Sequence, residues 1–304
     1  MALNAHTTYY EDKRTSTKPV PMGSYHLVIE YSSHVTCEDI TNGVPIRDTR
    51  YWGIMSSNGA KNLTFKNCSM SRFDAHRGFW NCEEAGYAKN SVAALREAQE
   101  AGFWGSEFDV NITADSVLIV YHDGEINGKK IEEHPYSEFK DFKIANGETI
   151  PTIDEFLAQG KKYPATKLVY EFKPQSNPET ENTFVNLAIA NLAENVLLDP
   201  DRVMFISFSR NICERLARML PGYTVQYLNS DMDPDQLHEL KVNGVDYNHE
   251  VFVKNPKWYK MARKNGMSVN AWTVNKEEDM VRMIKLGVDQ ITTDYPLELR
   301  ALLK

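Results

Sequence analysis

The sequence has few cysteines and places none of them in a C-x-x-C pair. The four lie far apart in a chain of 304 residues, at Cys37, Cys68, Cys82 and Cys213. Neither a zinc site of the usual spacing nor a disulfide framework is indicated. Long apolar runs are also missing: none approaches 18 residues, which excludes a membrane-spanning helix.

Positive charge is scarce as well. The chain carries 34 Lys and Arg against 42 Asp and Glu, a net charge of −8, with no basic stripe, so we expect no nucleic-acid partner. The first residues lack the basic and apolar regions of a signal peptide, so the default expectation is a cytoplasmic protein. The apolar share of 42% is ordinary for a globular protein. The length suits one large domain with a small appendage, and the oligomeric state stays open.

Strand-like and helical patterns alternate from residue 71 onward. We expect eight strands, at 73–76, 106–112, 168–172, 203–208, 224–228, 245–248, 268–274 and 290–293. We expect helices between most of them, at 91–101, 152–157, 181–197, 212–220, 256–264, 276–286 and 296–303. Asn90 is the expected N-cap of the first helix, and Thr152 with Glu155 forms a capping box at the second. Eight strand–helix units in about 230 residues predict an α/β fold, a TIM-type (β/α)8 barrel. The stretch 124–147, after the His-Asp motif, is polar and irregular, which predicts a small insertion without regular structure over the barrel mouth.

The first seventy residues do not follow this alternation. Residues 35–41 and 63–69 share one pattern 28 positions apart, which resembles rungs of a right-handed parallel β-helix. A solenoid needs about three repeats, so a loosely ordered β-rich extension is an equal alternative, with 1–24 poorly ordered. We therefore divide the chain into a β-rich extension, 1–70, and a barrel, 71–304. Whether the extension is a functional module, a natural fusion or a gene-joining artefact stays open, because the stretch 69–75 is polar for a first barrel strand.

Acidic residues follow strand patterns at two places. Glu107 and Asp109 are two apart on one strand, so their side chains share a face, and strand ends in a barrel face its mouth. Glu171 ends another strand and Lys173 follows it. Carboxylate oxygens suit a hard cation such as Mg²⁺ or Ca²⁺, and a lysine suits phosphate. The alternatives are a solvated acidic pair and a surface ion pair.

Two histidines also stand beside strand ends. His76 ends the first strand, and His122 follows the apolar run 117–121. Imidazole titrates near neutral pH, so the pair suits a general base and a general acid. Arg77 offers a planar fork for phosphate oxygens, and Trp272 is placed to wall the site. The alternatives are structural histidines, a salt-bridged arginine and an aromatic ring between the barrel and helix layers.

Taken in chain order, these motifs resemble the glycerophosphodiester phosphodiesterase family. The likeness covers about residues 74–304 and is closest to Bacteroidetes-type members, which carry a Gly-x-x-Ile insertion after the His-Asp motif. The motifs are His76-Arg77-Gly78, Asn90-Ser91, Gly105-Ser106-Glu107-Phe108-Asp109-Val110, His122-Asp123, Ile150-Pro151-Thr152-Ile153-Asp154-Glu155, Glu171-Phe172-Lys173, Ala271-Trp272-Thr273-Val274-Asn275 and Thr293-Asp294-Tyr295-Pro296.

The resemblance implies a TIM-type barrel that hydrolyses glycerophosphodiesters, small-molecule substrates, to glycerol 3-phosphate and an alcohol. It implies a divalent cation, Mg²⁺ or Ca²⁺, on Glu107, Asp109 and Glu171. It implies acid–base catalysis by His76 and His122, with His76 as the working choice of base. It implies substrate binding by Arg77, Lys173 and Trp272. Members of the family are often exported, which leaves the location of this chain open.

Two other functions compete with this one. A related phospholipase-type phosphodiesterase would act on lipids and favour an exposed apolar rim, but the insertion has few apolar residues, mainly Ile126, Ile131, Phe139, Phe142 and Ile144. A non-catalytic carbohydrate-binding scaffold would present aromatic platforms on the N-terminal rungs. Tyr51 and Trp52 are the obvious candidates there.

Overall fold

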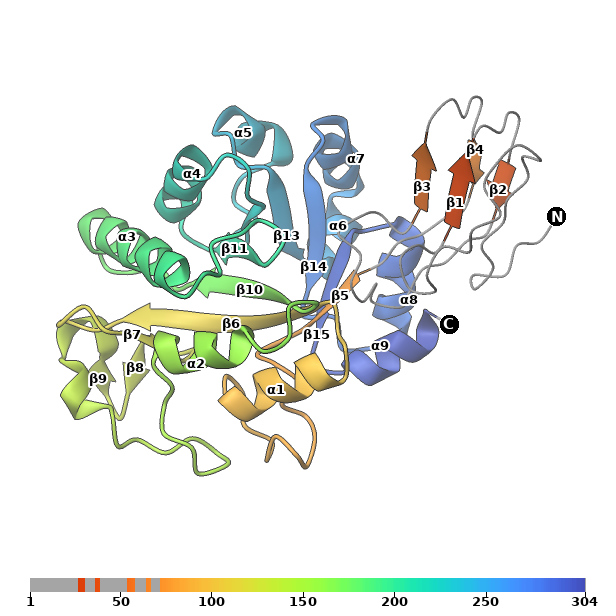
Figure 1. Ribbon diagram of the computed structural model, residues 1–304. Coiled ribbons are helices and arrows are strands. Elements are labelled where there is room, and N and C mark those ends of the chain that lie inside the picture. Colours follow the sequence, from red (N-terminus) through yellow and green to blue (C-terminus); the bar gives the residue numbers. More distant parts are fainter. Residues whose placement is uncertain (1–26, 31–35, 39–53, 58–63, 67–71, 304) are drawn as a thin grey trace.

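The centre of the structure, a computed structural model, is a closed barrel of parallel strands (Figure 1). The structure describes residues 27–30, 36–38, 54–57, 64–66 and 72–303. The barrel strands are β5 (Arg72–Ala75), β6 (Gly105–Ile112), β10 (Lys167–Phe172), β11 (Val203–Ser207), β12 (Val225–Tyr227), β13 (Gly244–Asn248), β14 (Ser268–Trp272) and β15 (Gln290–Thr293). Strand β15 pairs with β5, and β6 pairs with both β5 and β10, which closes the ring. The predicted TIM-type barrel is confirmed.

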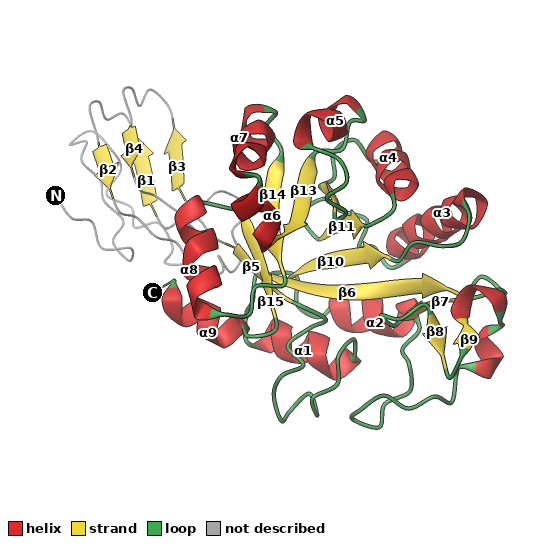
Figure 2. Ribbon diagram, turned by 180° about the vertical axis from the view of Figure 1, so that it is seen from behind, coloured by secondary structure: helices red, strands yellow, loops and turns green. Residues whose placement is uncertain are grey.

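Helices surround this barrel on the outside (Figure 2). They are α1 (Val92–Glu100), α2 (Ile153–Gly160), α3 (Pro178–Glu194), α4 (Arg210–Met219), α5 (Pro234–Glu239), α6 (His249–Lys254), α7 (Pro256–Lys264), α8 (Glu277–Leu286) and α9 (Pro296–Leu302). Thr152 and Glu155 form the predicted capping box. The prediction of Asn90 as N-cap is wrong, because the Ser91 side chain accepts from the Ala94 N–H. Among the described helices, none has the length and apolar character that a membrane crossing requires.

The strands alternate between two environments. On β10, Leu168, Tyr170 and Phe172 belong to the main core shared with the helices. Val169 instead belongs to a small cluster with Met204, and Glu171 lies opposite Asp109 of β6. Since successive side chains on a strand point to opposite faces, the second set fills the barrel interior. The helix side of the sheet is therefore apolar, and its inner side is mixed.

The base of the barrel, where the strands begin, holds a network of polar side chains. The Gln226 side-chain amide donates to Gln290 Oε1 at 2.8 Å and to Ser268 Oγ at 3.0 Å. Trp104 precedes β6 and packs against the inner cluster. The Arg72 guanidinium and the Lys167 ammonium lie 5.0 and 5.8 Å from the Trp104 ring. Polar side chains and the Trp104 ring with its two cations therefore fill the base of the barrel.

One carboxyl group above this network has no hydrogen-bond partner in the described part of the chain. Asp74 of β5 is fully buried, and neither of its oxygens accepts a hydrogen bond from a described residue. It packs so closely on Gly105 that a β-carbon there would overlap its carboxylate. Burial raises the pKa of Asp74 to about 7, although the Arg72 and Lys167 charges oppose the shift.

The segment after β6 is more ordered than the sequence indicated. Strand β7 (Leu118–Val120) pairs antiparallel with the end of β6, and β8 (Glu125–Ile126) forms a hairpin with β9 (Lys129–Lys130). Short 3-10 turns follow at Ile131–Glu133 and Tyr136–Glu138. The prediction of an irregular insertion is therefore partly wrong. The insertion has its own apolar cluster: Ile119, Ile126, Ile131, Phe139 and Ile150.

A carboxylate fastens this insertion to α1. The two Glu148 oxygens accept hydrogen bonds from the N–H groups of Val92 and Ala93, at 3.0 and 3.3 Å. These are N–H groups of the first turn of α1, which have no partner inside the helix. The insertion is thus fixed beside the loop that leads into α1.

Four short strands are described in the N-terminal part. They are β1 (Leu27–Glu30), β2 (Thr36–Glu38), β3 (Ile54–Ser57) and β4 (Thr64–Lys66). Strand β1 pairs in parallel with β3, and β2 with β4. Thr36 lies opposite Thr64, the 28-residue offset of the repeated pattern. The β-helix interpretation stays a prediction, because the connecting residues, the first 24 residues and both Tyr51 and Trp52 lie outside the described part.

Candidate active site

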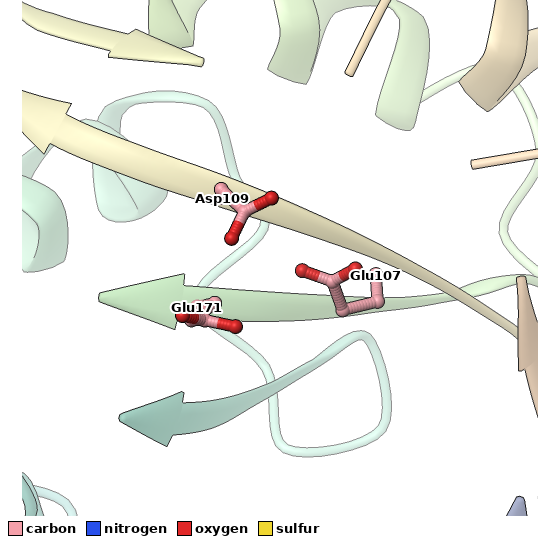
Figure 3. A group of neighbouring side chains, drawn as sticks. All are labelled: Glu107, Asp109 and Glu171. Carbon is pink, nitrogen blue, oxygen red and sulfur yellow. The ribbon is translucent and has the colours of Figure 1, made fainter. Parts of the chain in front are cut away.

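Three carboxylates meet near the mouth of the barrel, where the strands end (Figure 3). Glu107 and Asp109 come from β6, and Glu171 comes from β10, where it lies directly opposite Asp109. One oxygen from each lies within 4.8 Å of the others. All three are buried, at 2%, 1% and 7% exposed. The predicted acidic cluster is therefore formed.

The three carboxylates have unequal proton affinities. Burial and the charges of Asp109 and Glu171 raise the pKa of Glu107 well above its usual range. Burial and the Asp109 charge raise the pKa of Glu171 to about 7. Burial also acts on Asp109, but the charges of Lys173, His122 and Arg77 and a hydrogen bond from Asn90 lower its pKa overall. Asp109 is the ionised centre of the cluster.

Two cationic side chains stand against these carboxylates. The Lys173 ammonium donates to Glu171 at 2.8 Å and to Asp109 at 3.2 Å. Arg77 Nε lies 3.4 Å from the second Asp109 oxygen. Both side chains are mostly buried, at 14% and 18% exposed. The predicted phosphate partners Arg77 and Lys173 are thus brought to the cluster.

A sharp turn after β5 places the Arg77 backbone. Arg77 and Gly78 both have positive φ, at 57° and 81°. A β-carbon on Gly78 would lie 2.7 Å from the Ala94 side chain, so glycine is required there. The turn lets the Arg77 N–H donate to Glu107 Oε2 at 2.7 Å. The other oxygen, Glu107 Oε1, is buried and has no partner in the described part of the chain.

Asn90 contacts the acidic cluster, whereas we had predicted it only as the N-cap of a helix. Its side chain donates to Asp109 Oδ2 at 2.9 Å and accepts from the Asp109 N–H at 3.1 Å. It has a φ of 58°, which turns it away from the helix that it was predicted to cap. The sequence did contain a signal for this role, because Asn90 belongs to the Asn90-Ser91 motif that resembles the family.

Each of the two histidines lies within hydrogen-bond distance of an aspartate, but the two pairs differ in their exposure. His76 Nδ1 lies 2.8 Å from Asp294 Oδ1, and these side chains are 18% and 15% exposed. His122 Nδ1 lies 2.7 Å from Asp123 Oδ1, and these are 39% and 63% exposed. Burial lowers the pKa of His122, the Asp109 charge opposes this, and the Lys173 charge adds to it. These effects of Asp109 and Lys173 put His122 within electrostatic reach of the acidic cluster.

Trp272 lies on the inner side of the barrel. It packs with the inner cluster of Val169, Met204 and their neighbours, and its ring centroid is 5.5 Å from that of Phe208. Its indole N–H donates to the Asp246 carbonyl at 2.8 Å. The alternative of a ring between barrel and helix layers is therefore wrong for this residue.

A TIM-type barrel with charged side chains gathered where its strands end is the architecture of an enzyme. Residues 76–298 match the profile of the Glycerophosphoryl diester phosphodiesterase family. The chain belongs to this family, and the predicted resemblance is confirmed.

Known proteins agree with this assignment. The structure is similar to that of a glycerophosphodiester phosphodiesterase from Parabacteroides distasonis, with 40% identity, a TM-score of 0.74, and coverage of 77% of this chain and 97% of that one. A glycerophosphodiester phosphodiesterase from Caldanaerobacter subterraneus is 27% identical over 239 residues, 73% of this chain and 93% of its own. An Oleispira antarctica phosphodiesterase, solved with its product sn-glycerol-3-phosphate, shares the fold at 23% identity and a TM-score of 0.66, covering 76% and 98%.

Proposed function

We propose that this glycerophosphodiester phosphodiesterase uses a divalent cation and a pair of histidines to release glycerol 3-phosphate and an alcohol. The observation that carries the proposal is the cluster of Glu107, Asp109 and Glu171, with ligand oxygens within 4.8 Å of one another. Three buried carboxylates at this spacing repel one another when ionised, so a cation between them would be strongly favoured.

The residues present fit a hard cation. Glu107, Asp109 and Glu171 would hold it through oxygen atoms, the ligands that Mg²⁺ and Ca²⁺ prefer. Glu107 Oε1 is a buried oxygen with no hydrogen-bond partner among the described residues, as a ligand oxygen would be. When bound, the cation would supply charge neutralisation at the phosphate oxygens.

Arg77 and Lys173 would bind the phosphate group. Two of the three ammonium protons of Lys173 go to Glu171 and Asp109, which leaves one for a phosphate oxygen. Arg77 Nε is ion-paired with Asp109 at 3.4 Å but makes no hydrogen bond to any described residue. Both groups keep positive charge beside the place where negative charge accumulates during the reaction.

His76 and His122 would carry the proton transfers. His76 would remove a proton from the glycerol 2-hydroxyl or from water, and His122 would protonate the leaving alkoxide. In both rings Nδ1 is engaged by a carboxylate. Nε2 of each ring is then the atom that exchanges the proton. Trp272 would line the glycerol side of the site.

The decisive experiment is a coupled assay of released glycerol 3-phosphate over a panel of glycerophosphodiesters. We expect EDTA to abolish activity and Mg²⁺ or Ca²⁺ to restore it. Indifference to the chelator would reject the cation. We expect His122→Ala and His76→Ala to lose about 10²–10⁴ in rate. Near-normal turnover by either would reject the histidine pair.

A soluble diester fits better than a membrane lipid. The insertion turns Ile126, Ile131 and Phe139 inward, and each is at most 3% exposed. An apolar rim for lipid docking is therefore not supported by the described insertion. Vesicles of intact phospholipid belong in the same panel, and faster hydrolysis of these would favour the phospholipase-type alternative.

We also propose that residues 71–304 are the catalytic unit. The family match, residues 76–298, lies within this range. A truncated chain that starts at Arg72 is expected to keep activity and thermal stability. A large loss of either would give residues 1–70 a structural or catalytic role.

A further inference from the structure

Asp294, which directly follows β15, makes four polar contacts with three residues. Its Oδ1 lies 2.8 Å from His76 Nδ1 and accepts from the Trp80 indole N–H at 3.1 Å. Its Oδ2 accepts from the Asn275 amide at 2.7 Å, and its own backbone N–H donates to Asn275 Oδ1 at 2.9 Å. A carboxylate with this many fixed partners has one orientation.

Further contacts fix the partners themselves. The Thr293 hydroxyl donates to Asn275 Oδ1 at 3.2 Å. The His76 backbone N–H donates to the Thr293 carbonyl at 3.0 Å, which ties His76 to the residue before Asp294. The Lys89 ammonium lies 4.4 Å from the centre of the Trp80 ring. The network therefore joins β5, the loop after it, the end of β14 and the end of β15.

The arrangement determines which imidazole nitrogen carries the proton. A carboxylate only accepts, so Nδ1 of His76 must be the donor, and Nε2 of the neutral ring is left as an acceptor. Burial acts against the Asp294 charge, but hydrogen bonds from His76, Asn275 and Trp80 lower the pKa of Asp294 to about 2. It stays ionised at any pH at which the enzyme would work.

We propose that Asp294, held by Asn275 and Trp80, is the positioning residue that makes His76 the base. This rests on the proposed function of the histidine pair and sharpens it. When His76 takes a proton, an O–H bond of the attacking hydroxyl breaks and an N–H bond forms at Nε2. Nδ1 keeps its proton, and Asp294 balances the charge of the imidazolium without being protonated itself.

Asp123 provides a matched comparison within the same chain. It accepts from His122 at a similar distance, 2.7 Å, but it is the neighbouring residue and is 63% exposed. Water can replace an exposed partner more easily than a mostly buried one, and the His76–Asp294 pair is mostly buried and joins residues 218 positions apart. We therefore assign the fixed base to His76 and the acid to the more exposed His122.

The main test is Asp294→Asn against Asp123→Asn. An amide at position 294 can donate to Nδ1 and favour the wrong tautomer. We expect kcat to fall by about 10³-fold or more, with KM changed less than about three-fold. We expect Asp123→Asn to lose less than about ten-fold. A kcat for Asp294→Asn within about three-fold of wild type would overturn the proposal.

A double variant separates positioning from general damage. In a His76→Ala background, Asp294→Asn should cost nothing more, because its effect acts through the missing imidazole. A further loss of about ten-fold or greater in that background would also overturn the proposal. If His76→Ala itself keeps normal turnover, the proposed function fails instead, so the two failures are distinguishable.

Two measurements keep the test valid if Asp294→Asn folds poorly. Nitrogen-15 NMR of the full chain should show a protonated Nδ1 on neutral His76, identified by its absence in His76→Ala. A protonated Nε2 in the wild type would overturn the proposal.

The milder variants Trp80→Phe and Asn275→Ala each remove support from Asp294 and should lower kcat about ten-fold, with Mg²⁺ binding by calorimetry unchanged. Unaltered kcat in both would count against the proposal.

Discussion

The mouth and the base of the barrel are both polar, but their charged side chains have different neighbours. At the mouth, Glu107, Asp109 and Glu171 crowd together, and Glu107 Oε1 has no hydrogen-bond partner within the part of the chain that the structure describes. At the base, the Gln226 amide donates to Gln290 and Ser268, and Trp104 packs beside two cations, whose charges also act on the buried Asp74 carboxyl group. The mouth crowds three carboxylates whose repulsion a bound cation would relieve, whereas the base sets one buried carboxyl group against two cations. Variants at the mouth should therefore affect activity, and variants at the base should affect folding.

The largest expected effect is at the mouth. Glu107→Gln should lower kcat/KM by about 10³-fold or more, because several kcal/mol of charge stabilisation depend on the carboxylate cluster. It should not destabilise the metal-free protein at pH 8. The raised pKa of Glu107 means that its ionisation costs the folded state stability as pH rises above the usual carboxyl range.

The measurements are steady-state kinetics and thermal unfolding in EDTA at pH 8. Glu298→Gln, on the helix α9 outside the barrel, is the control and should alter neither quantity. A clear drop in the melting temperature of Glu107→Gln would contradict the contrast, since it would make this mouth residue a structural one.

The second effect concerns the base and its pH dependence. The pKa of Asp74 is about 7 in the folded protein, above the ordinary value near 4, so its contribution to folding becomes less favourable as pH rises from about 4 to about 7. At about 1.4 kcal/mol per ten-fold change in proton affinity, the loss is bounded at roughly 4 kcal/mol. Asp74→Asn should therefore be more stable than wild type at pH 8 and no more stable at pH 4.

Urea unfolding at the two pH values measures this difference. Kinetics at pH 7 should change less than about three-fold, because Asp74 touches none of the proposed catalytic groups. A variant that is more destabilised at pH 8 than at pH 4 would show that the Asp74 carboxylate is needed in its charged form.

The third effect is the loss of packing at the base. Trp104→Ala should destabilise the barrel by about 3 kcal/mol, the lower part of the range for removal of a tryptophan, since the ring is partly exposed. The expected fall in melting temperature is roughly 6–12 °C. Below the transition, kcat should stay within about three-fold of wild type. Trp104→Phe should restore much of the stability, and a catalytic defect without a stability defect would be the opposite of what we expect.

The smallest effect is expected for one hydroxyl group in the base network. Ser268→Ala removes the 3.0 Å contact with the Gln226 amide, whose 2.8 Å bond to Gln290 remains, and a long 3.4 Å contact of the hydroxyl with the Asn243 carbonyl. We expect a cost of about 1 kcal/mol in urea unfolding and unaltered kinetics. A cost of about 3 kcal/mol or more would mean that the network is cooperative rather than a set of separate bonds.

Much of the fold could be predicted from local patterns. The eight barrel strands fall where alternation and apolar runs placed them, and the Thr152 capping box is formed. Helices α5 and α6 were missed because six residues each are too few to show a 3.6-residue period. The choice of Asn90 over Ser91 as N-cap failed because both residues suit the position, and only the contact with Asp109 decides between them.

The individual residues of the site could be predicted from the sequence, but several of the contacts between them could not. Glu107 and Asp109 share a face by strand geometry alone, and Glu171 is placed by the register between β6 and β10. The pairing of His76 with Asp294 depends on closure of the ring, which no local pattern contains. The same holds for Trp104, whose role at the base depends on cations from two other strands.

The contact between the first and last barrel strands also has a consequence for the order of folding. Contacts between strands that are far apart in the sequence form late in folding. Closing the long loop between them costs conformational entropy before any contact stabilises the pair. His76 acquires its partner only when β15 docks beside β5. During refolding, helical signal should therefore return before activity does. A nascent chain that already holds His76, Glu107 and Glu171 has no fixed orientation for the His76 ring until its final strand is in place.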